Sequence, residues 1–239
     1  MIRAQDLGIR FDTAGWVFRG LDFNLNRGGS WAIVGPSGSG KTVLLKLIAG
    51  LCRPTAGSLS INTRDIGMLF QKNALFDSFT VEENLLFPLK ERKGIVGPKA
   101  RACAAGWLDS VGLSNTQALY PDELSGGMQK RLGIARALIA EPELILYDEP
   151  TAGLDPITSK KIAELMVKLK NESGATLVVV TNDIHRAYQL GDQIDLLARG
   201  KIAHGGSPTE VRATRDPAFR QFIDGLASGP LTESESALE

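Results

Sequence analysis

The segment WAIVGPSGSGKTVLLKLIAGL, residues 31–51, changes its hydrophobic pattern halfway along. It begins with a short apolar run that is typical of a buried strand. Its second half repeats apolar residues at the spacing of one helical face: Val43, Leu44, Leu47, Ile48 and Leu51. Because GPSGSGKT, residues 35–42, joins the two halves, the sequence predicts a strand that passes through a glycine loop into a helix.

The glycine loop has the spacing of a phosphate-binding loop, or P-loop. It consists of Gly35, Pro36, Ser37, Gly38, Ser39, Gly40, Lys41 and Thr42. Glycines let backbone N–H groups surround phosphate oxygens at a helix N-terminus, where the helix dipole also favours negative charge. We expect Lys41 to neutralise the β and γ phosphates of ATP, and the Thr42 hydroxyl to ligate Mg²⁺. The alternative is a glycine-rich turn with an incidental lysine, which the flanking strand and helix disfavour.

Two carboxylates follow another apolar run, in LILYDEP, residues 144–150. A buried central strand would deliver Asp148 to the edge of the sheet where it can hold hydrated Mg²⁺. Glu149 would then lie beside the water that attacks the γ phosphate. Taken alone, the pair is also consistent with a solvated strand end, but the P-loop upstream favours the catalytic interpretation.

Gln71 follows the apolar run IGMLF, residues 66–70. An amide at the end of such a strand can contact both Mg²⁺ and the attacking water. A surface glutamine is the equally simple alternative.

A second glycine pair occurs in ELSGGMQKR, residues 123–131. Ser125, Gly126 and Gly127 precede a helix, so they offer backbone N–H groups and a hydroxyl to an anion. One P-loop already surrounds the phosphates of its own nucleotide. We therefore expect this second loop to reach the γ phosphate of an ATP held by another copy, in a head-to-tail dimer. An ordinary capped helix start is the alternative.

Composition limits the possible classes of protein. The 239 residues are 43% hydrophobic and 23% charged, enough for a sizeable core. Lysine plus arginine equals aspartate plus glutamate at 27 each, so the balance favours neither nucleic acid nor an anionic membrane surface. No apolar run approaches the roughly 20 residues that cross a bilayer, so we expect no direct membrane insertion. The isolated cysteines Cys52 and Cys103 suit a reducing cytoplasm.

The remaining sequence predicts the order of the elements. Residues 1–34 contain short strands that favour an antiparallel edge, and from residue 142 strands alternate with helices, as in a parallel sheet. Between them, residues 80–113 are predicted to be mostly helical, and 126–140 form a further amphipathic helix. The helical stretch at 80–113 should be interrupted at Pro88, Gly94, Gly97 and Pro98. The prediction is an α/β fold with a helical insertion.

The C-terminal end carries clear helix boundaries. In RDPAFRQFIDG, Asp216 is the expected cap, Pro217 the first helical residue and Gly225 the stop. Residues 229–239 are predicted to be a mobile tail.

In their order and spacing, the motifs resemble the ATP-binding cassette (ABC) family over residues 1 to about 205. The motifs are GPSGSGKT, Gln71, LSGGMQKR, LILYDEP and AGLD. The resemblance implies a P-loop NTPase core with a mainly parallel sheet, an N-terminal antiparallel β-subdomain, an inserted helical subdomain and dimeric ATP hydrolysis.

Family roles pass to the matching positions. The resemblance places Ser125 and Gly127 on the partner copy's γ phosphate and Asp155 across the dimer interface. It also makes Glu149 the base for the hydrolytic water. Phe11 resembles the aromatic residue that stacks on adenine, with Trp16 as a rival, and either residue is otherwise a simple packing group.

A narrower resemblance is to the ATPases of Mla-type lipid-trafficking transporters. It rests on LFQKNALFDSFTVEENLLFPL (69–89), DEPTAGLDPIT (148–158) and FRQFIDGLASGP (219–230). It implies an MlaE-like membrane permease for phospholipid or a related lipid, and a place on the cytoplasmic face of the inner membrane.

The same resemblance assigns two further surfaces. A C-terminal extension, residues 206–239, would help to hold the ATPase dimer, and a helical subdomain is expected at about 72–140 within a domain of residues 1–205. A groove would receive a permease helix; its residues are Leu75, Phe76, Phe79 and Phe87. The alternative for these apolar residues is the core of the helical subdomain.

The sequence departs from the ABC pattern after LVVV, where family members usually place a histidine that contacts the γ phosphate. Here the phrase is TND, so Asn182 stands at that position. An amide donates a hydrogen bond but carries neither a proton for transfer nor a positive charge. We predict slow hydrolysis. His185 and His204 are expected to be surface or capping residues.

A second departure is the short segment between Gly57 and IGMLF, which predicts a trimmed antiparallel subdomain.

Three other functions compete with a lipid-transport ATPase. One is the ATPase of another ABC importer or exporter with a different cargo, and another is a purely structural nucleotide-binding subunit. The third, an ABC protein that acts on DNA or ribosomes, fits poorly because such proteins usually carry coiled-coil insertions or two cassettes.

Overall fold

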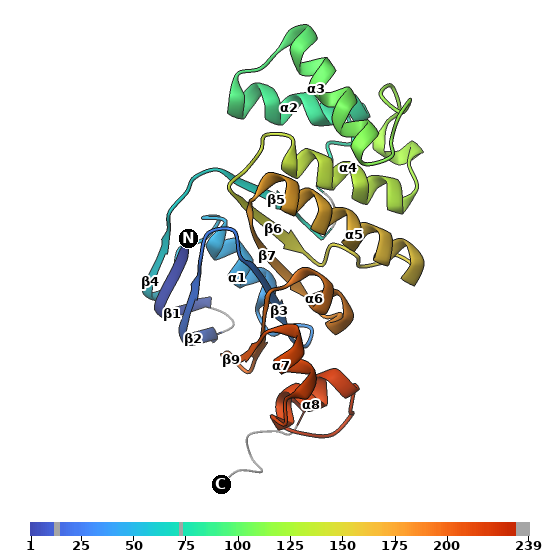
Figure 1. Cartoon of the computed structure of the whole chain (residues 1–239). Helices are drawn as coiled ribbons and strands as arrows, with labels where there is room; N and C mark the ends of the chain where they lie inside the picture. Colours follow the sequence, from blue (N-terminus) through green and yellow to red (C-terminus); the bar gives the residue numbers. More distant parts are fainter. Residues whose placement is uncertain (12–14, 72–73, 233–239) are drawn as a thin grey trace. The chain divides into compact units, whose positions relative to one another are not determined.

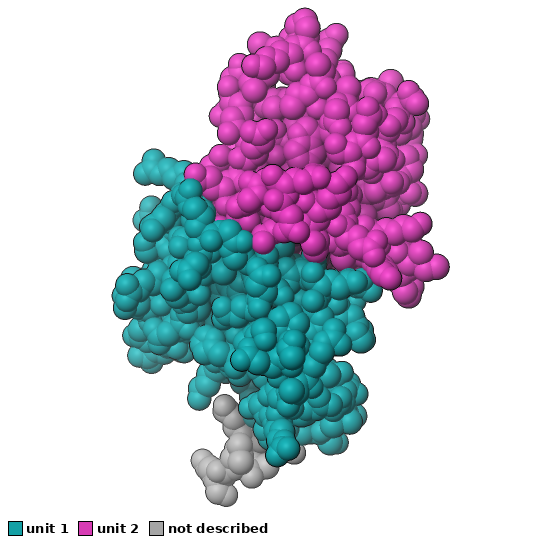
Figure 2. Space-filling view, viewed as in Figure 1, with its two compact units in different colours: residues 1–64, 177–239 teal, residues 65–176 magenta. Residues whose placement is uncertain are grey.

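The computed structural model describes residues 1–11, 15–71 and 74–232. The chain forms two compact units (Figure 2). The first unit comprises Met1–Arg64 and Leu177–Glu239, and the second comprises Asp65–Thr176. Within the described ranges, no helix has both the length and the apolar character of a membrane span. The division predicted at 1–205, 72–140 and 206–239 stays a prediction, and residues 72–73 lie outside the described part.

The first unit begins with an antiparallel sheet (Figure 1). Its strands are β1 (Ile2–Phe11), β2 (Gly15–Leu25) and β4 (Ala56–Ile61), in the order β2-β1-β4. Ile2 of β1 pairs with Leu25 on one side and Ile61 on the other. The antiparallel arrangement predicted for the N-terminal strands is confirmed.

Parallel strands form the centre of the same unit. They are β3 (Ser30–Val34), β7 (Thr176–Thr181) and β8 (Gln193–Ala198), with β3 paired in parallel to both others. Every residue of β3 is buried, as expected for a strand covered on both faces. Helices α1 (Lys41–Ile48) and α6 (Ile184–Leu190) follow β3 and β7. The predicted parallel sheet is confirmed.

The antiparallel hairpin that follows residue 198 was not predicted. β9 (Lys201–Gly206) pairs antiparallel with β8. The turn between them consists of Arg199 and Gly200, both with positive φ, at 50° and 71°. This is the backbone of a two-residue hairpin, in which two positive φ angles match the strand twist. The sequence signal was weak because arginine rarely takes that conformation.

The first unit ends in two short helices, α7 (Pro208–Ala213) and α8 (Pro217–Asp224). The predicted boundaries of α8 are confirmed, because the Asp216 side chain accepts from Phe219 N and Gly225 ends the helix with φ of 64°.

The predicted tail is wrong for residues 229–232, and its residues 233–239 lie outside the described part. The side chain of Gln221, buried on α8, reaches these residues. Its Oε1 accepts from Leu231 N at 2.6 Å, and its Nε2 donates to Thr232 Oγ1 at 3.0 Å. A buried amide needs such partners, and the chain after α8 supplies them.

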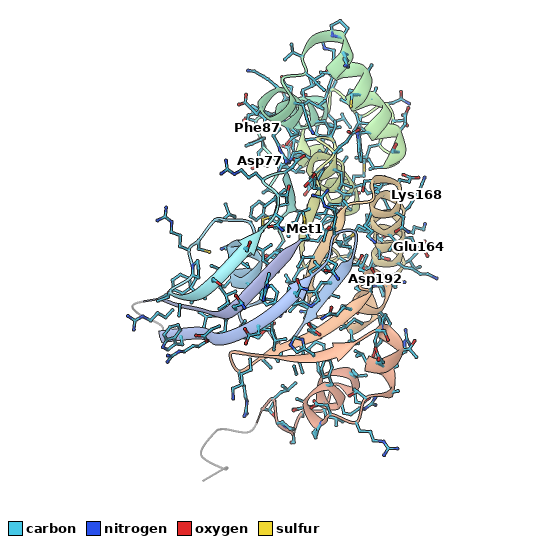
Figure 3. The ribbon with its side chains drawn as sticks, turned by 60° about the vertical axis from the view of Figure 1, so that its left-hand side comes forward. Met1, Asp77, Phe87, Glu164, Lys168 and Asp192 are labelled. Carbon is cyan, nitrogen blue, oxygen red and sulfur yellow. The ribbon has the colours of Figure 1, made fainter. Side chains whose placement is uncertain are left out.

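The second unit combines one parallel strand pair with helices. Strands β5 (Ile66–Leu69) and β6 (Leu144–Asp148) pair in parallel. The helices are α2 (Val81–Lys93), α3 (Gly97–Ser110), the 3-10 turn η1 (Pro121–Glu123), α4 (Gly126–Leu138) and α5 (Pro156–Ser173). Helices α2 and α3 pack together and both contact α4, which also contacts α5 (Figure 1). Glu164 and Lys168 lie on the solvent-facing side of α5 (Figure 3).

The interruption predicted at Pro88 is wrong, because α2 runs through it to Lys93. A proline inside a helix costs about 3 kcal/mol. Two features oppose that cost: the capping box between Thr80 and Glu83, and the burial of Asn84 and its apolar neighbours on the same helix. The helix ends instead at Gly94, which has φ of 64°.

Asp195 on β8 is a fully buried carboxylate with a complete set of donors. Its Oδ2 accepts from Trp31 Nε1 at 2.8 Å and from Gln193 Nε2 at 2.9 Å, and lies 3.1 Å from His204 Nδ1. Its Oδ1 accepts from Gly205 N at 3.2 Å. His204 is therefore more than the surface or capping residue expected from sequence, because it links β9 to a buried acid.

We predict that Asp195→Ala lowers the free energy of unfolding by about 2–4 kcal/mol, because it leaves the buried Trp31 indole and the half-buried Gly205 N–H without their acceptor. Urea titration followed by tryptophan fluorescence measures the change. The control is Asp224→Ala, which removes a half-exposed ion pair with Arg220 and should cost less than about 1 kcal/mol. Equal losses in the two variants would contradict the prediction.

Candidate functional site

The P-loop lies in the first unit, between β3 and α1, and glycine is required along it. Gly38 and Gly40 have φ of 81° and 98°, a region that other residues rarely adopt. At Gly35, a Cβ atom would lie 2.1 Å from the carbonyl oxygen of Leu197. The loop therefore keeps its bare backbone exposed to whatever it encloses, as phosphate binding demands.

Lys41 is buried at the start of α1, with its ammonium turned into the loop. Its Nζ donates to the carbonyl oxygens of Gly35, at 2.7 Å, and Pro36, at 2.9 Å. Among the described residues, the buried hydroxyl of Ser39 has no hydrogen-bond partner. A buried hydroxyl without a partner is costly, and a phosphate oxygen would supply one. The loop thus fits the triphosphate of ATP.

Asn182 directly follows β7 in the same unit, and its side chain is exposed. The next residue, Asp183, caps α6 by accepting from His185 N at 2.8 Å and Arg186 N at 3.2 Å. His185 is exposed on α6, with its ring at an edge to Tyr188. It is a surface histidine, as predicted, and lies in the helix that follows Asn182.

The second unit holds the two acids at the end of β6. Asp148 is the last residue of the strand and is buried, whereas Glu149 is half-buried. Glu149 has φ of 45°, in the left-handed region that non-glycine residues seldom occupy. Such strain persists where the surrounding structure imposes it, and it often marks functional positions. The turn separates the two carboxylates into different environments.

Gln71 lies two residues beyond β5 and is exposed. Its backbone oxygen accepts from Lys130 Nζ at 2.7 Å. The contact ties the segment after β5 to α4. Sequence reasoning missed Lys130, although a signal existed: it is spaced by four residues from Ile134 and by eight from Leu138, both on the buried face of α4.

The second glycine loop and the residues around Asp155 line one hollow of about 610 Å³ in the second unit. Ser125 caps α4 by accepting from Met128 N at 3.3 Å. Asp155 caps α5 by accepting from Ile157 N and Thr158 N, both at 3.0 Å. Hydrogen bonds from Thr158 and then Ile157 hold the pKa of Asp155 below its ordinary value. The hollow brings two predicted interface motifs together.

The predicted residues divide between the units. The first unit holds Phe11, the P-loop and Asn182, and the second holds Gln71, Asp148, Glu149, the SGG loop and Asp155. Thr42, Gln71 and Asp148 offer hydroxyl, amide and carboxylate oxygens, which are the ligands that Mg²⁺ prefers. Each of these three oxygen types suits the metal.

The two rival adenine-stacking residues differ in what already covers them. Phe11 and Trp16 expose 45% and 41% of their surface. The Trp16 ring is approached by the guanidinium groups of Arg19, at 5.0 Å, and Arg10, at 5.7 Å. An adenine on Trp16 would compete with these cations, so Phe11 is the better candidate.

Comparison with known proteins gives a consistent result. A family model described as ABC transporter matches residues 18–152. The intermembrane phospholipid transport ATP-binding protein MlaF of Escherichia coli K12 is 38% identical over 230 residues, covering 90% of this chain and 86% of MlaF. The sulfate/thiosulfate import ATP-binding protein CysA of Mycobacterium bovis is 41% identical, covering 87% of this chain but 62% of CysA.

A solved structure has the same fold. It is a dimeric bacterial ABC transporter cassette, MJ0796, with a TM-score of 0.77 and 34% identity, covering 85% of this chain and 97% of that one.

We predict that Phe11→Ala weakens ATP binding about tenfold, because stacking on a base contributes about 1–3 kcal/mol. Trp16→Ala should change the dissociation constant less than about threefold, since its ring is engaged by arginines. Titration calorimetry with ATP in the presence of EDTA, which prevents turnover, measures both. A larger loss for Trp16→Ala would reverse the assignment.

Proposed function

Since the chain belongs to the ABC transporter family and is an ATP-binding, ATP-hydrolysing subunit, we propose that it drives a separate membrane permease that moves phospholipid or a related lipid. The observation that carries the lipid assignment is the similarity to MlaF, which extends over nearly the whole of both chains. The subunit would act on the cytoplasmic face of the membrane, held there by an MlaE-like permease.

The proposed chemistry assigns a role to each predicted residue. Lys41 and the P-loop backbone bind the phosphates of ATP, and Phe11 stacks on adenine. Glu149 accepts the proton of the attacking water, which Gln71 orients. Thr42, Gln71 and Asp148 would hold Mg²⁺, which neutralises charge on the β and γ phosphates.

A second copy would complete the site. In the proposed head-to-tail dimer, Ser125, Gly126 and Gly127 of one copy bind the γ phosphate held by the other, and Asp155 lies at the interface. The local geometry supports this role: the Ser125 oxygen accepts from Met128 N, which still leaves its O–H to donate to a phosphate. The similarity to a dimeric cassette supports the assembly.

An apolar hollow of about 390 Å³ on α2 and α3 is the proposed docking groove for a permease helix. Of the four residues predicted for the groove, Phe79 and Phe87 line this hollow, together with Leu86 and Val96. Leu75 and Phe76 are not among its lining residues. Phe76 and Phe87 are 39% and 40% exposed, and their ring centroids are 4.9 Å apart. That exposure favours a docking surface over the helical-core alternative. Phe87 lies on the outer side of α2 (Figure 3).

The loop before α2 is fixed by one buried side chain. Asn84 Nδ2 donates to the carbonyl oxygens of Phe76, at 3.1 Å, and Phe79, at 3.2 Å. Asn84 Oδ1 accepts from Phe76 N at 2.9 Å. These bonds fix the backbone at Phe76 and Phe79, and Phe87 is held on α2, so less conformational entropy is lost on docking.

A second cargo class has its own support. The identity to CysA shows that cassettes of this similarity also occur in a protein named for sulfate and thiosulfate import. The catalytic motifs do not distinguish the two cargo classes, so another importer or exporter ATPase is the alternative function.

We predict that the tagged chain, solubilised with its membranes in mild detergent, co-purifies with an integral membrane permease and with phospholipid detectable by mass spectrometry. Phe87→Ser should lose the permease while retaining ATP hydrolysis in isolation, because the groove lies outside the residues assigned to ATP. Lys168→Ser, an exposed change on α5, is the matched control and should retain the permease. A captured permease without lipid would favour the alternative cargo.

We predict that Asn182→His raises the kcat of ATP hydrolysis at least tenfold. A histidine restores an oriented contact to developing charge, which is worth on the order of 2–4 kcal/mol in the barrier. Asn182→Ala is the control and should not accelerate the reaction. Steady-state phosphate release measures all three proteins, and an unchanged or lower rate in Asn182→His would refute slow hydrolysis as a consequence of this residue.

A further inference from the structure

Lys130 is a buried cation in the second unit that lies within the LSGGMQKR motif but has no role in the proposed chemistry. It lies on α4, and only 4% of its surface is exposed. Burying an ammonium costs several kcal/mol unless hydrogen bonds and charges compensate. A methionine of similar length would fill the same space without that cost. The cost of burying this charge indicates that the charge itself has a role.

The first partner of the ammonium is the backbone at Gln71. Helix α4 packs closely on β5, since a Cβ atom at Gly67 would lie 2.2 Å from the carbonyl oxygen of Ala137. From this helix, Lys130 Nζ reaches the carbonyl oxygen of Gln71 at 2.7 Å. A charge-assisted bond of this length fixes the peptide that carries the Gln71 amide.

The second set of partners is the pair of acids after β6. Burial lowers the pKa of Lys130, whereas the charges of Asp148 and Glu149 act in the opposite direction and favour its protonated form. The attraction is mutual, so a cation here also stabilises two adjacent carboxylates that repel each other. Lys130 thus contacts the backbone of Gln71 and interacts electrostatically with Asp148 and Glu149, the residues of this unit to which water positioning, metal binding and proton transfer are assigned.

We propose that Lys130 is a positioning residue for ATP hydrolysis: its ammonium holds the Gln71 backbone in place and supplies the positive charge beside Asp148 and Glu149. The inference rests on the proposed roles of those three residues. In the proposed function the P-loop and Phe11 bind the nucleotide from the other unit, so its affinity should change little without Lys130. The cation acts on turnover.

The test compares three substitutions at one position. Lys130→Met keeps the length and removes the charge, Lys130→Arg keeps a cation, and Lys130→Gln keeps a donor without charge. Lys168→Met on the exposed face of α5 is the control. For each full-length protein, steady-state hydrolysis gives kcat and KM for ATP with Mg²⁺, fluorescence titration with a trinitrophenyl ATP analogue gives nucleotide affinity, and thermal melting gives Tm.

We expect Lys130→Met to lower kcat at least tenfold, with KM and analogue affinity changed less than about threefold. Its Tm should be equal to or above that of the wild type, since a buried charge is removed. Lys130→Arg should recover most of the rate and Lys130→Gln little of it, a ranking that packing alone would not produce. Lys168→Met should match the wild type.

Two outcomes would overturn the inference. One is a kcat of Lys130→Met within twofold of the wild type, and the other is a lost rate that Arg and Gln restore equally. If Lys130→Met fails to fold, the comparison of Lys130→Arg with Lys130→Gln still decides. Glu149→Gln separates this inference from the proposed catalytic roles. If Glu149→Gln hydrolyses ATP normally, the proposed catalytic roles are wrong. If Glu149→Gln is inactive while Lys130→Met remains active, only the inference about Lys130 is wrong.

Discussion

A lysine ammonium hydrogen bonded to backbone carbonyls organises the site residues in each unit. Among the described residues, the buried lysines are Lys41 and Lys130. Lys41 donates to its own glycine loop, and Lys130 donates to the segment after β5. Both bonds hold a loop that follows a parallel strand, which is where functional groups collect in α/β folds. A carbonyl oxygen accepts a hydrogen bond from the ammonium but does not cancel its positive charge, so each ammonium still attracts anions.

The chain also carries backbone strain where its proposed chemistry needs it. Three P-loop glycines have positive φ angles that only glycine adopts without strain: Gly35, Gly38 and Gly40. Glu149 has a left-handed conformation although it is not a glycine. The cost at Glu149 is of order 1–3 kcal/mol and must be met by the packing of β6 around it. Its benefit is that Asp148 and Glu149, although adjacent, have different exposure and can serve different functions. Asn182 has no such left-handed backbone conformation, and it lies exposed beyond β7.

Local patterns allowed the sequence to predict much of this structure. The passage from β3 through the P-loop to α1, the parallel strands and the boundaries of α8 each depend on residues close in the chain, and all are confirmed. The errors involve distant partners. Pro88 is tolerated because Asn84 and the surrounding core hold α2, and residues 229–232 fold back because Gln221 needs partners. Lys130 was missed because its bond reaches a carbonyl 59 residues away. The assigned catalytic roles stay predictions.

Helix α4 connects the proposed nucleotide contacts of the second unit with its proposed docking surface. Ser125 caps its first turn, Lys130 lies one turn later, and Arg136 lies in its last turn. Arg136 Nη1 donates to Asn84 Oδ1 at 3.4 Å, and its guanidinium lies 5.2 Å from the centre of the Phe76 ring. At about 1.5 Å of rise per residue, some 16 Å separate the first contact from the last. A hydrogen-bonded helix transmits displacement over that distance with little bending, so a displacement at Ser125 reaches Asn84 and Phe76 as long as the contacts of Arg136 hold.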